Sequence, residues 1–179
     1  MIYQIVQRYA RAIFESAKEN NKLNELNVDF LMIKSILSQS IELNDFVLNP
    51  VISENKRRKV LEQIFRGKVQ DITYRFLMFL ETKKRLFLLE RIADSFESIY
   101  LKFTKTVKAT ITSSMKLSDA QVAEICKNLE KKINLKILPN LNVDEELIGG
   151  VKIQIEDKVY DYSIKTQLNS FYQRCLHGN

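Results

Sequence analysis

Two adjacent glycines near the C-terminal end constrain the fold more than any other feature, because this chain of 179 residues holds only four glycines. Gly149 and Gly150 come directly before a segment in which apolar and polar residues alternate. That period of two is typical of a half-buried strand, and paired glycines indicate a backbone conformation or a close approach that a Cβ would forbid. The sequence therefore predicts a strand over 151–155 that begins at a tightly packed point.

The residues after that strand predict a hairpin and a last helix. Glu156, Asp157 and Lys158 can turn the chain into a second short strand, and Asp161 and Ser163 are candidate caps for the helix that follows. The apolar positions of this helix recur at helical spacing and are Ile164, Leu168, Phe171, Tyr172 and Cys175. The chain is thus expected to end in a strand, a hairpin and a capped helix.

The first 105 residues read instead as one helix after another, because apolar residues recur every three or four positions. The six expected helices cover 6–17, 23–37, 41–48, 54–66, 72–80 and 86–103. Pro50 stops the third helix, Ser53 is expected to cap the fourth, and Gly67 is expected to follow its end. Residues 82–85 are polar but contain neither Gly nor Pro, so one helix over about 71–103 is the alternative. Such a helix would be over-long for a globular domain, and we favour a break.

The pattern changes near residue 106. Residues 106–112 are rich in β-branched side chains, which favour a strand. Ser118 and Gln121 fit a capping box before a helix through Ile133. A strand over 136–143 contains Pro139, which indicates an edge strand or a bulge. The predicted fold is α+β: an N-terminal six-helix bundle (1–105) followed by a small β-α-β-β-β-α domain (106–179).

The residue inventory argues against catalysis. Cys126 and Cys175 lack partners at metal spacing and read as small buried hydrophobes, and His177 is the single histidine. A histidine metal site or a Ser-His-Asp triad is therefore not expected. Gly149 precedes a strand rather than a helix, which excludes a phosphate loop or a dinucleotide fingerprint there. The one carboxylate cluster, 144–146, reads as a solvated turn. We expect no catalytic residue, no cofactor and no metal.

Charge leaves a second function class open. The net charge is +6, and residues 1–105 hold 18 of the 28 Lys and Arg residues against 13 of the 22 Asp and Glu residues. Two basic runs, 56–59 and 83–85, could contact phosphates non-specifically. No helix-turn-helix, RNA-recognition or zinc-finger pattern accompanies them. A basic nucleic-acid-binding protein is kept as the alternative, and a small enzyme acting through paired carboxylates as a weaker third class.

The first helix carries a different signal, since residues 9–14 combine small and aromatic side chains. Alanines at helical spacing allow another helix to approach closely. Ordinary packing within the bundle is one interpretation, and a groove for a partner's amphipathic helix is the other.

Taken together, four motifs resemble the delta subunit of the bacterial F-type ATP synthase, a relative of the mitochondrial oligomycin-sensitivity-conferring protein. They are Tyr9-Ala10-x-Ala12-x-Phe14, then Asn49-Pro50 with Lys56 and Phe65, then Arg85-Leu86-x-Leu88-Leu89 with Ile92 and Phe96, and finally Gly149-Gly150-Val151-x-Ile153 with Asp161-x-Ser163. The last is the most specific. The chain departs from the family at Glu156, at Tyr162 and in the stretch 82–84, where relatives often have Gly, Gly and Asn respectively.

The resemblance implies a non-catalytic stator subunit on the cytoplasmic face of the bacterial membrane, where it couples proton-driven rotation to ATP synthesis. The helical domain would bind N-terminal helices of alpha subunits, and the second domain would bind the b subunits of the peripheral stalk. Neither nucleic acid nor direct membrane contact is implied. The helix groove carried over from the family comprises Tyr9, Ala10, Ile13, Phe14, Ala17, Phe76, Leu77, Phe79 and Leu80. An N-terminus without a signal or transit segment is expected to keep the chain in the cytosol.

Overall fold

The computed structural model describes residues 2–40, 43, 46, 49 and 52–176. The chain forms two compact units, Met1–Tyr100 and Leu101–Asn179. The first is helical and the second combines helices with a sheet, so the chain is an α+β protein, as predicted.

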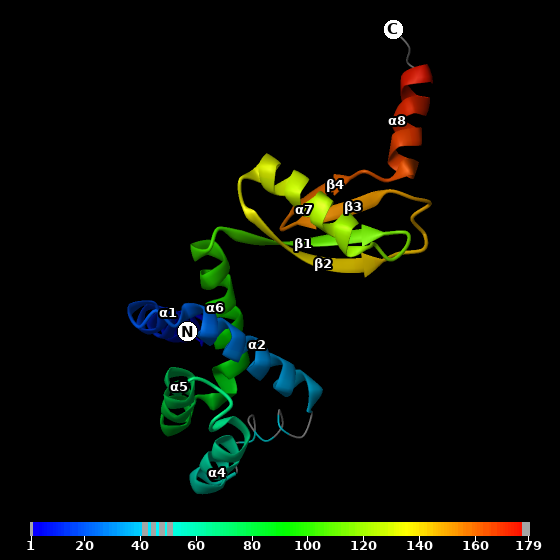
Figure 1. Ribbon diagram of the computed structural model, residues 1–179. Helices are drawn as coiled ribbons and strands as arrows, with labels where there is room; N and C mark the ends of the chain where they lie inside the picture. The colour runs from blue at the N-terminus through cyan, green and yellow to red at the C-terminus, as the bar shows by residue number, and fades with distance from the viewer. Residues whose placement is uncertain (1, 41–42, 44–45, 47–48, 50–51, 177–179) are drawn as a thin grey trace. The chain divides into compact units, whose positions relative to one another are not determined.

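Helices α1 (Ile2–Glu19), α2 (Leu23–Gln39), α4 (Glu54–Phe65) and α5 (Asp71–Thr82) are followed by a 3₁₀ turn, η1 (Leu86–Leu88), and by α6 (Leu89–Phe103) (Figure 1). The predicted break after α5 is confirmed, since Lys84 adopts a φ of 55°. The sixth helix starts later than predicted, because its first three residues form η1. The helix predicted over 41–48 lies outside the described residues, apart from Leu43 and Phe46.

One hydrophobic core holds the helical unit together. Phe96 of α6 is fully buried and packs against Phe30 and Phe14, with ring centroids 4.8 and 6.1 Å away. The stripes predicted for the first two helices supply nine of the buried side chains: Val6, Ala10, Ile13, Phe14, Ala17, Leu26, Phe30, Ile33 and Leu37. Burial of a large apolar side chain stabilises the fold by about 1.5–3 kcal/mol, so this core fixes where α1 and α5 lie.

The cap predicted for α4 is not formed, whereas α5 is capped by a residue of another helix. Ser53 lies at the N-cap of α4, but its side chain makes no capping hydrogen bond. The N-terminal end of α5 is capped from another helix: the Gln70 amide and the Thr73 hydroxyl donate to Asp29 Oδ2 over 2.8 and 2.5 Å. Asp29 is a buried residue of α2, and so it ties α2 to α5.

The second unit consists of β1 (Thr106–Ser113), α7 (Asp119–Ile133), β2 (Lys136–Val143), β3 (Val151–Ile155), β4 (Lys158–Asp161) and α8 (Ile164–Leu176). The strand order is β2-β1-β3-β4, with β1 parallel to β2 and the other neighbours antiparallel. Helix α7 connects the parallel pair and lies across the sheet (Figure 1). The order β-α-β-β-β-α is the one predicted from the sequence.

A smaller core lies between α7 and the sheet: Ala109, Ile111, Leu129, Ile137, Ile153 and Ile155. The capping box is confirmed, since the Ser118 amide donates to Gln121 Oε1 over 2.9 Å and the Gln121 amide to Ser118 Oγ over 3.4 Å. Pro139 lies on β2, an edge strand, as predicted. Cys126 is only half-buried, and its partial burial raises the pKa of its thiol.

Candidate partner-binding surfaces

Most residues of the groove carried over from the family are core residues. Seven of the nine are buried: Ala10, Ile13, Phe14, Ala17, Phe76, Leu77 and Leu80. Tyr9 is half-buried, and Phe79 keeps 45% of its surface exposed. A partner helix can therefore touch few of these nine side chains directly, and the buried ones support the surface from within the core.

A cleft of about 550 Å³ nevertheless lies between α1 and α5. Its lining residues are Ile13, Ser16, Asn20, Lys22, Gln70, Asp71, Ile72, Arg75, Phe76 and Phe79. Ile13, Phe76 and Phe79 were among those predicted, whereas Ile72 and the polar lining residues were missed. Ser16 and Asn20 follow Ile13 at i+3 and i+7, so helical spacing beside the apolar stripe could have found them. We call this feature the α1–α5 cleft.

Aromatic rings and cations gather where α5 ends. The ring of Tyr9 meets those of Phe79 and Phe76 edge-on, at centroid distances of 6.0 and 6.5 Å. Arg85 Nη1 donates to the Tyr9 hydroxyl over 2.6 Å, and Lys83 Nζ lies 5.8 Å from the centroid of the Phe79 ring. Because both cations follow α5, the break after this helix brings Lys83 to the exposed ring of Phe79 and Arg85 to the ring of Tyr9.

An ion pair fixes α5 from its other side. Glu81 is 2% exposed, and Arg57 Nε of α4 lies 3.3 Å from its Oε1. Arg57 Nη2 also donates to the Ile52 carbonyl over 2.7 Å. Burial raises the pKa of the Glu81 carboxyl, and the charge of Arg57 opposes that rise. Removing either partner would leave a buried charge uncompensated, so the pair holds α5 in position.

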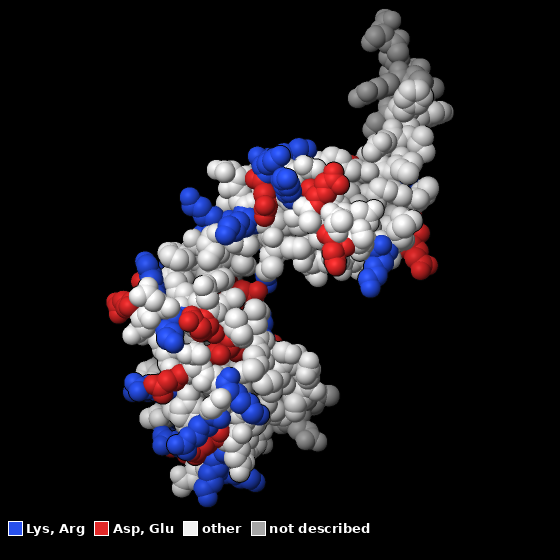
Figure 2. Space-filling model, in the orientation of Figure 1, with Lys and Arg blue, Asp and Glu red and all other residues white. Residues whose placement is uncertain are grey.

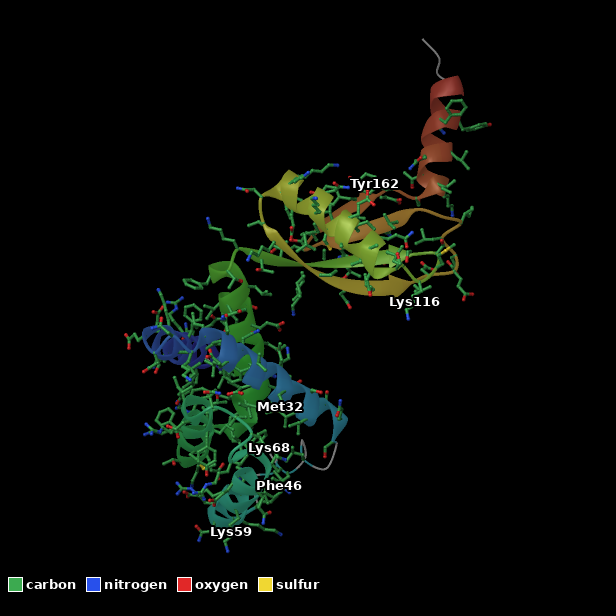
Figure 3. The ribbon with its side chains drawn as sticks, in the orientation of Figure 1. Met32, Phe46, Lys59, Lys68, Lys116 and Tyr162 are labelled. Carbon is green, nitrogen blue, oxygen red and sulfur yellow. The ribbon has the colours of Figure 1, made fainter. Side chains whose placement is uncertain are left out.

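The Gly149-Gly150 motif joins the start of β3 to the start of α8. Gly150 has a φ of +82°, and a Cβ there would lie 2.3 Å from the Tyr162 carbonyl oxygen. The Tyr162 amide donates to the Val151 carbonyl over 2.9 Å, and the Ile164 amide to the Gly149 carbonyl over 3.0 Å. The close approach predicted from the two glycines is thus confirmed, and its partner is the segment 162–164. Figure 3 labels Tyr162 where β4 leads into α8.

Asp161 and Ser163 cap α8, as predicted. The Thr166 amide donates to Ser163 Oγ over 3.3 Å, while the Ser163 amide and the Thr166 hydroxyl donate to the Asp161 carboxylate over 2.8 and 2.9 Å. These hydrogen bonds from Ser163 and Thr166 lower the pKa of Asp161. Ile153 is buried in the sheet core and Val151 packs at its margin. The C-terminal family motif therefore builds the root of α8.

Helix α8 itself exposes its apolar side chains. The predicted stripe is present, but Ile164, Leu168, Phe171 and Tyr172 are 44–68% exposed. Side chains at i, i+4, i+7 and i+8 share one helix face, so they form a continuous stripe. Figure 1 shows α8 extending away from the sheet. We call these four residues the α8 stripe.

The described residues offer few features of a metal site, a membrane-spanning helix or a nucleic-acid-binding surface. No group of three or more His, Cys, Asp or Glu side chains there could hold a metal ion. None of the described helices combines the length and apolar character that a bilayer crossing needs. On the face that Figure 2 shows, acidic side chains lie among the basic ones, which does not resemble the basic stripe of a nucleic-acid-binding surface.

Comparison with known proteins identifies relatives over most of the chain. The family model described as ATP synthase delta (OSCP) subunit matches residues 5–174. ATP synthase subunit delta of Chlorobaculum tepidum is 37% identical over 162 residues, covering 90% of each chain. The same subunit of Clostridium perfringens is 33% identical over 170 residues, covering 95% of each.

A solved structure shares the fold over nearly the full length. A chain of the Toxoplasma gondii mitochondrial ATP synthase hexamer has a TM-score of 0.70 and 26% identity, covering 96% of this chain and 97% of that one. These relatives give no support to the nucleic-acid alternative. The chain belongs to the ATP synthase delta (OSCP) subunit family, whose members are structural stator subunits of the ATP synthase rather than catalytic ones.

Proposed function

We propose that this chain links the catalytic head of an F-type ATP synthase to the peripheral stalk through two separate surfaces. The domain 1–105 binds the N-terminal helix of an alpha subunit in the α1–α5 cleft. The domain 106–179 binds the b subunits through the hairpin and the α8 stripe. The chain then lies at the cytoplasmic face of the bacterial membrane and is held there only through the complex.

The observation that supports the proposal is that each unit has a distinct surface feature suited to a helix, the α1–α5 cleft in the first and the α8 stripe in the second. The α1–α5 cleft runs between two helices and combines an exposed aromatic ring with a polar rim. A groove of this kind accepts the apolar face of an amphipathic helix at i, i+3 and i+7 positions. Its walls are held by a packed core, so the cleft is present without a partner.

The α8 stripe supports the second contact. A capped helix with four large apolar side chains on one exposed face would cost free energy in water. A helical stalk end could cover this face by ordinary helix packing. The root of α8 is fixed by the glycine motif, so a partner bound to the stripe would be connected rigidly to the sheet.

The head contact can be tested by calorimetric titration of the full chain with a synthetic alpha-subunit N-terminal peptide. Saturable one-to-one binding is expected, and Ser16→Arg should weaken it at least tenfold, because the new side chain fills the cleft. Ser35→Arg changes an exposed serine of α2 outside the cleft and should leave binding unchanged. An unaffected Ser16→Arg variant would contradict the cleft assignment. Substitutions at Ala10 or Ala17 are unsuitable, since both are fully buried.

The stalk contact can be tested in the same way with a C-terminal fragment of a b subunit. Phe171→Asp places a charge in the α8 stripe and should abolish binding, whereas Lys165→Asp on the same helix should have a smaller effect. Equal loss in both variants would argue against the stripe as the contact face.

A further inference from the structure

We infer that the α1–α5 cleft selects a helix with acidic flanks, and that Lys83 on the ring of Phe79 is a specificity-determining residue. The inference rests on the proposed function of the cleft and names the chemistry of its partner. It follows from the charges around the cleft and from the place where they lie relative to its apolar surface.

The cleft walls carry an excess of positive charge. Among the lining residues the charged ones are Lys22, Asp71 and Arg75. Asp71 is already neutralised, because its Oδ2 lies 2.7 Å from Arg75 Nη2. Lys22 Nζ donates to the neutral amide oxygen of Gln70 over 3.2 Å, so its charge remains available to a carboxylate. Glu19 follows the lining residue Ser16 at i+3 on α1 but does not itself line the cleft.

The aromatic end of the cleft adds two more cations. Lys83 and Arg85 form no salt bridge with any residue in the described part of the chain, and their contacts are with the neutral rings of Phe79 and Tyr9. A cation near the C-terminal end of a helix is stabilised by the helix dipole, which favours Lys83 at this position after α5. Positive charge is therefore held at the cleft without a counter-ion from the described residues.

The position of Lys83 couples charge to the apolar contact. Its ammonium lies 5.8 Å from the centroid of the Phe79 ring, which lines the cleft and is 45% exposed. A partner that places an apolar side chain on Phe79 would bring the next polar position of its helix close to Lys83 and Arg85. A carboxylate there gains charge-assisted hydrogen bonds, whereas a lysine or arginine is repelled. The cleft thus discriminates between helices of equal hydrophobicity by the sign of their flanks.

Two designed helical peptides test the inference in calorimetric titrations of the full chain. Both carry the same apolar face, with glutamates on the flanks of one and lysines on the flanks of the other. The acidic peptide is expected to bind about tenfold more tightly at low salt, since several exposed ion pairs each contribute a few-fold. The difference should shrink as salt screens the charges.

Charge-reversal variants test whether Lys83 causes the preference for the acidic peptide. Lys83→Glu should reduce the preference for the acidic peptide about three- to tenfold. Lys59→Glu is the matched control, because Lys59 is exposed on α4 (Figure 3), which contributes no residue to the cleft. The control makes the same change in net charge, so only a local effect distinguishes the two variants.

Some results would contradict the charge preference of the cleft without contradicting its proposed function. Equal binding of both peptides, tighter binding of the basic peptide, or equal losses in the two lysine variants would overturn the charge inference while leaving the cleft as a helix-binding site. If neither peptide binds and the alpha-subunit peptide also fails, the cleft assignment itself is overturned.

Discussion

The two units of this chain bury their apolar side chains to different extents. The helical unit gathers 21 buried apolar residues into one core among its described residues, and the surface proposed for its partner is the α1–α5 cleft. The second unit buries six and leaves the α8 stripe exposed. A core of the first size can stabilise a domain by itself, whereas the α8 stripe would become buried only against a partner. We therefore expect substitutions to affect mainly folding in the first unit, and in α8 mainly assembly.

The largest expected difference in stability is between the same substitution at one glycine of each unit. Gly150→Ala introduces a Cβ 2.3 Å from a backbone carbonyl at a φ of +82°, and strain and clash together should destabilise the second unit by about 3 kcal/mol or more. Gly67→Ala, at a φ of +75° with no atom within 4 Å of the new Cβ, should cost the first unit only about 1 kcal/mol. Hydrogen exchange resolved by unit measures both losses, and similar values would contradict the role of the glycine motif.

A smaller effect is expected at the cross-helix cap. Asp29→Ala removes the acceptor of the Gln70 amide and of the buried Thr73 hydroxyl, which should cost the first unit about 1–3 kcal/mol in denaturant unfolding. Asp94→Ala is the control. It breaks the bond from Lys34 to a 58% exposed side chain, which is worth about 0–1 kcal/mol.

Two carboxyl groups should give the units opposite responses to pH. Burial raises the pKa of Glu81 above 4.5 in the folded state. Between 4.5 and that raised pKa the folded state binds more protons than the unfolded state, so the contribution of Glu81 to stability falls as pH rises. Hydrogen bonds from Ser163 and Thr166 lower the pKa of Asp161 below 3.8, so its contribution is present above 3.8 and is lost as pH falls through the lowered pKa.

Isosteric amides separate these two responses. Glu81→Gln should flatten the pH dependence of the first unit above 4.5, and Asp161→Asn that of the second unit below 3.8, when exchange is followed across this range. If either variant changed the pH dependence of the other unit, or changed it in the opposite direction, other titratable groups would dominate the pH dependence of stability.

The smallest expected effect on folding is at the α8 stripe. Phe171 is 68% exposed, so Phe171→Ala should change the stability of the free chain by no more than about 0.5 kcal/mol. The same substitution at the buried Phe96 should cost about 3–5 kcal/mol. Denaturant unfolding of both variants checks the contrast, and a large loss at Phe171 would mean that α8 packs within its own unit in solution.

Local signals in the sequence predicted most of the fold. Apolar periodicity located the described helices, and β-branched residues located β1. Glycine, proline and capping patterns placed the α8 root, the β2 edge and the start of α7, because each depends on residues close together in the chain. The hairpin turn was also placed, although Glu156 adopts a φ of 51° where a glycine would be unstrained.

Exposure and long-range contacts could not be predicted in the same way. The periodicity of residues 164–175 shows an apolar face but not whether anything covers it, so the exposure of α8 had to come from the structure. The groove residues were for the most part core, because one stripe on α1 serves both the core and the cleft margin. The pairing of Asp29 with residues more than 40 positions away has no local signature.

The strand order has a mechanical consequence for a subunit that must resist torque. The chain enters the sheet at Thr106, the first residue of β1, while the root of α8 is fixed beside Val151, which pairs with Ser113 at the far end of that strand. A pull between these two points loads the β1–β3 ladder along its length, so its hydrogen bonds resist in shear together. A pull at the sheet edge would instead peel them apart one at a time. Because β1 is a central strand, a force between the root of α8 and the chain leaving α6 is carried by these hydrogen bonds in shear.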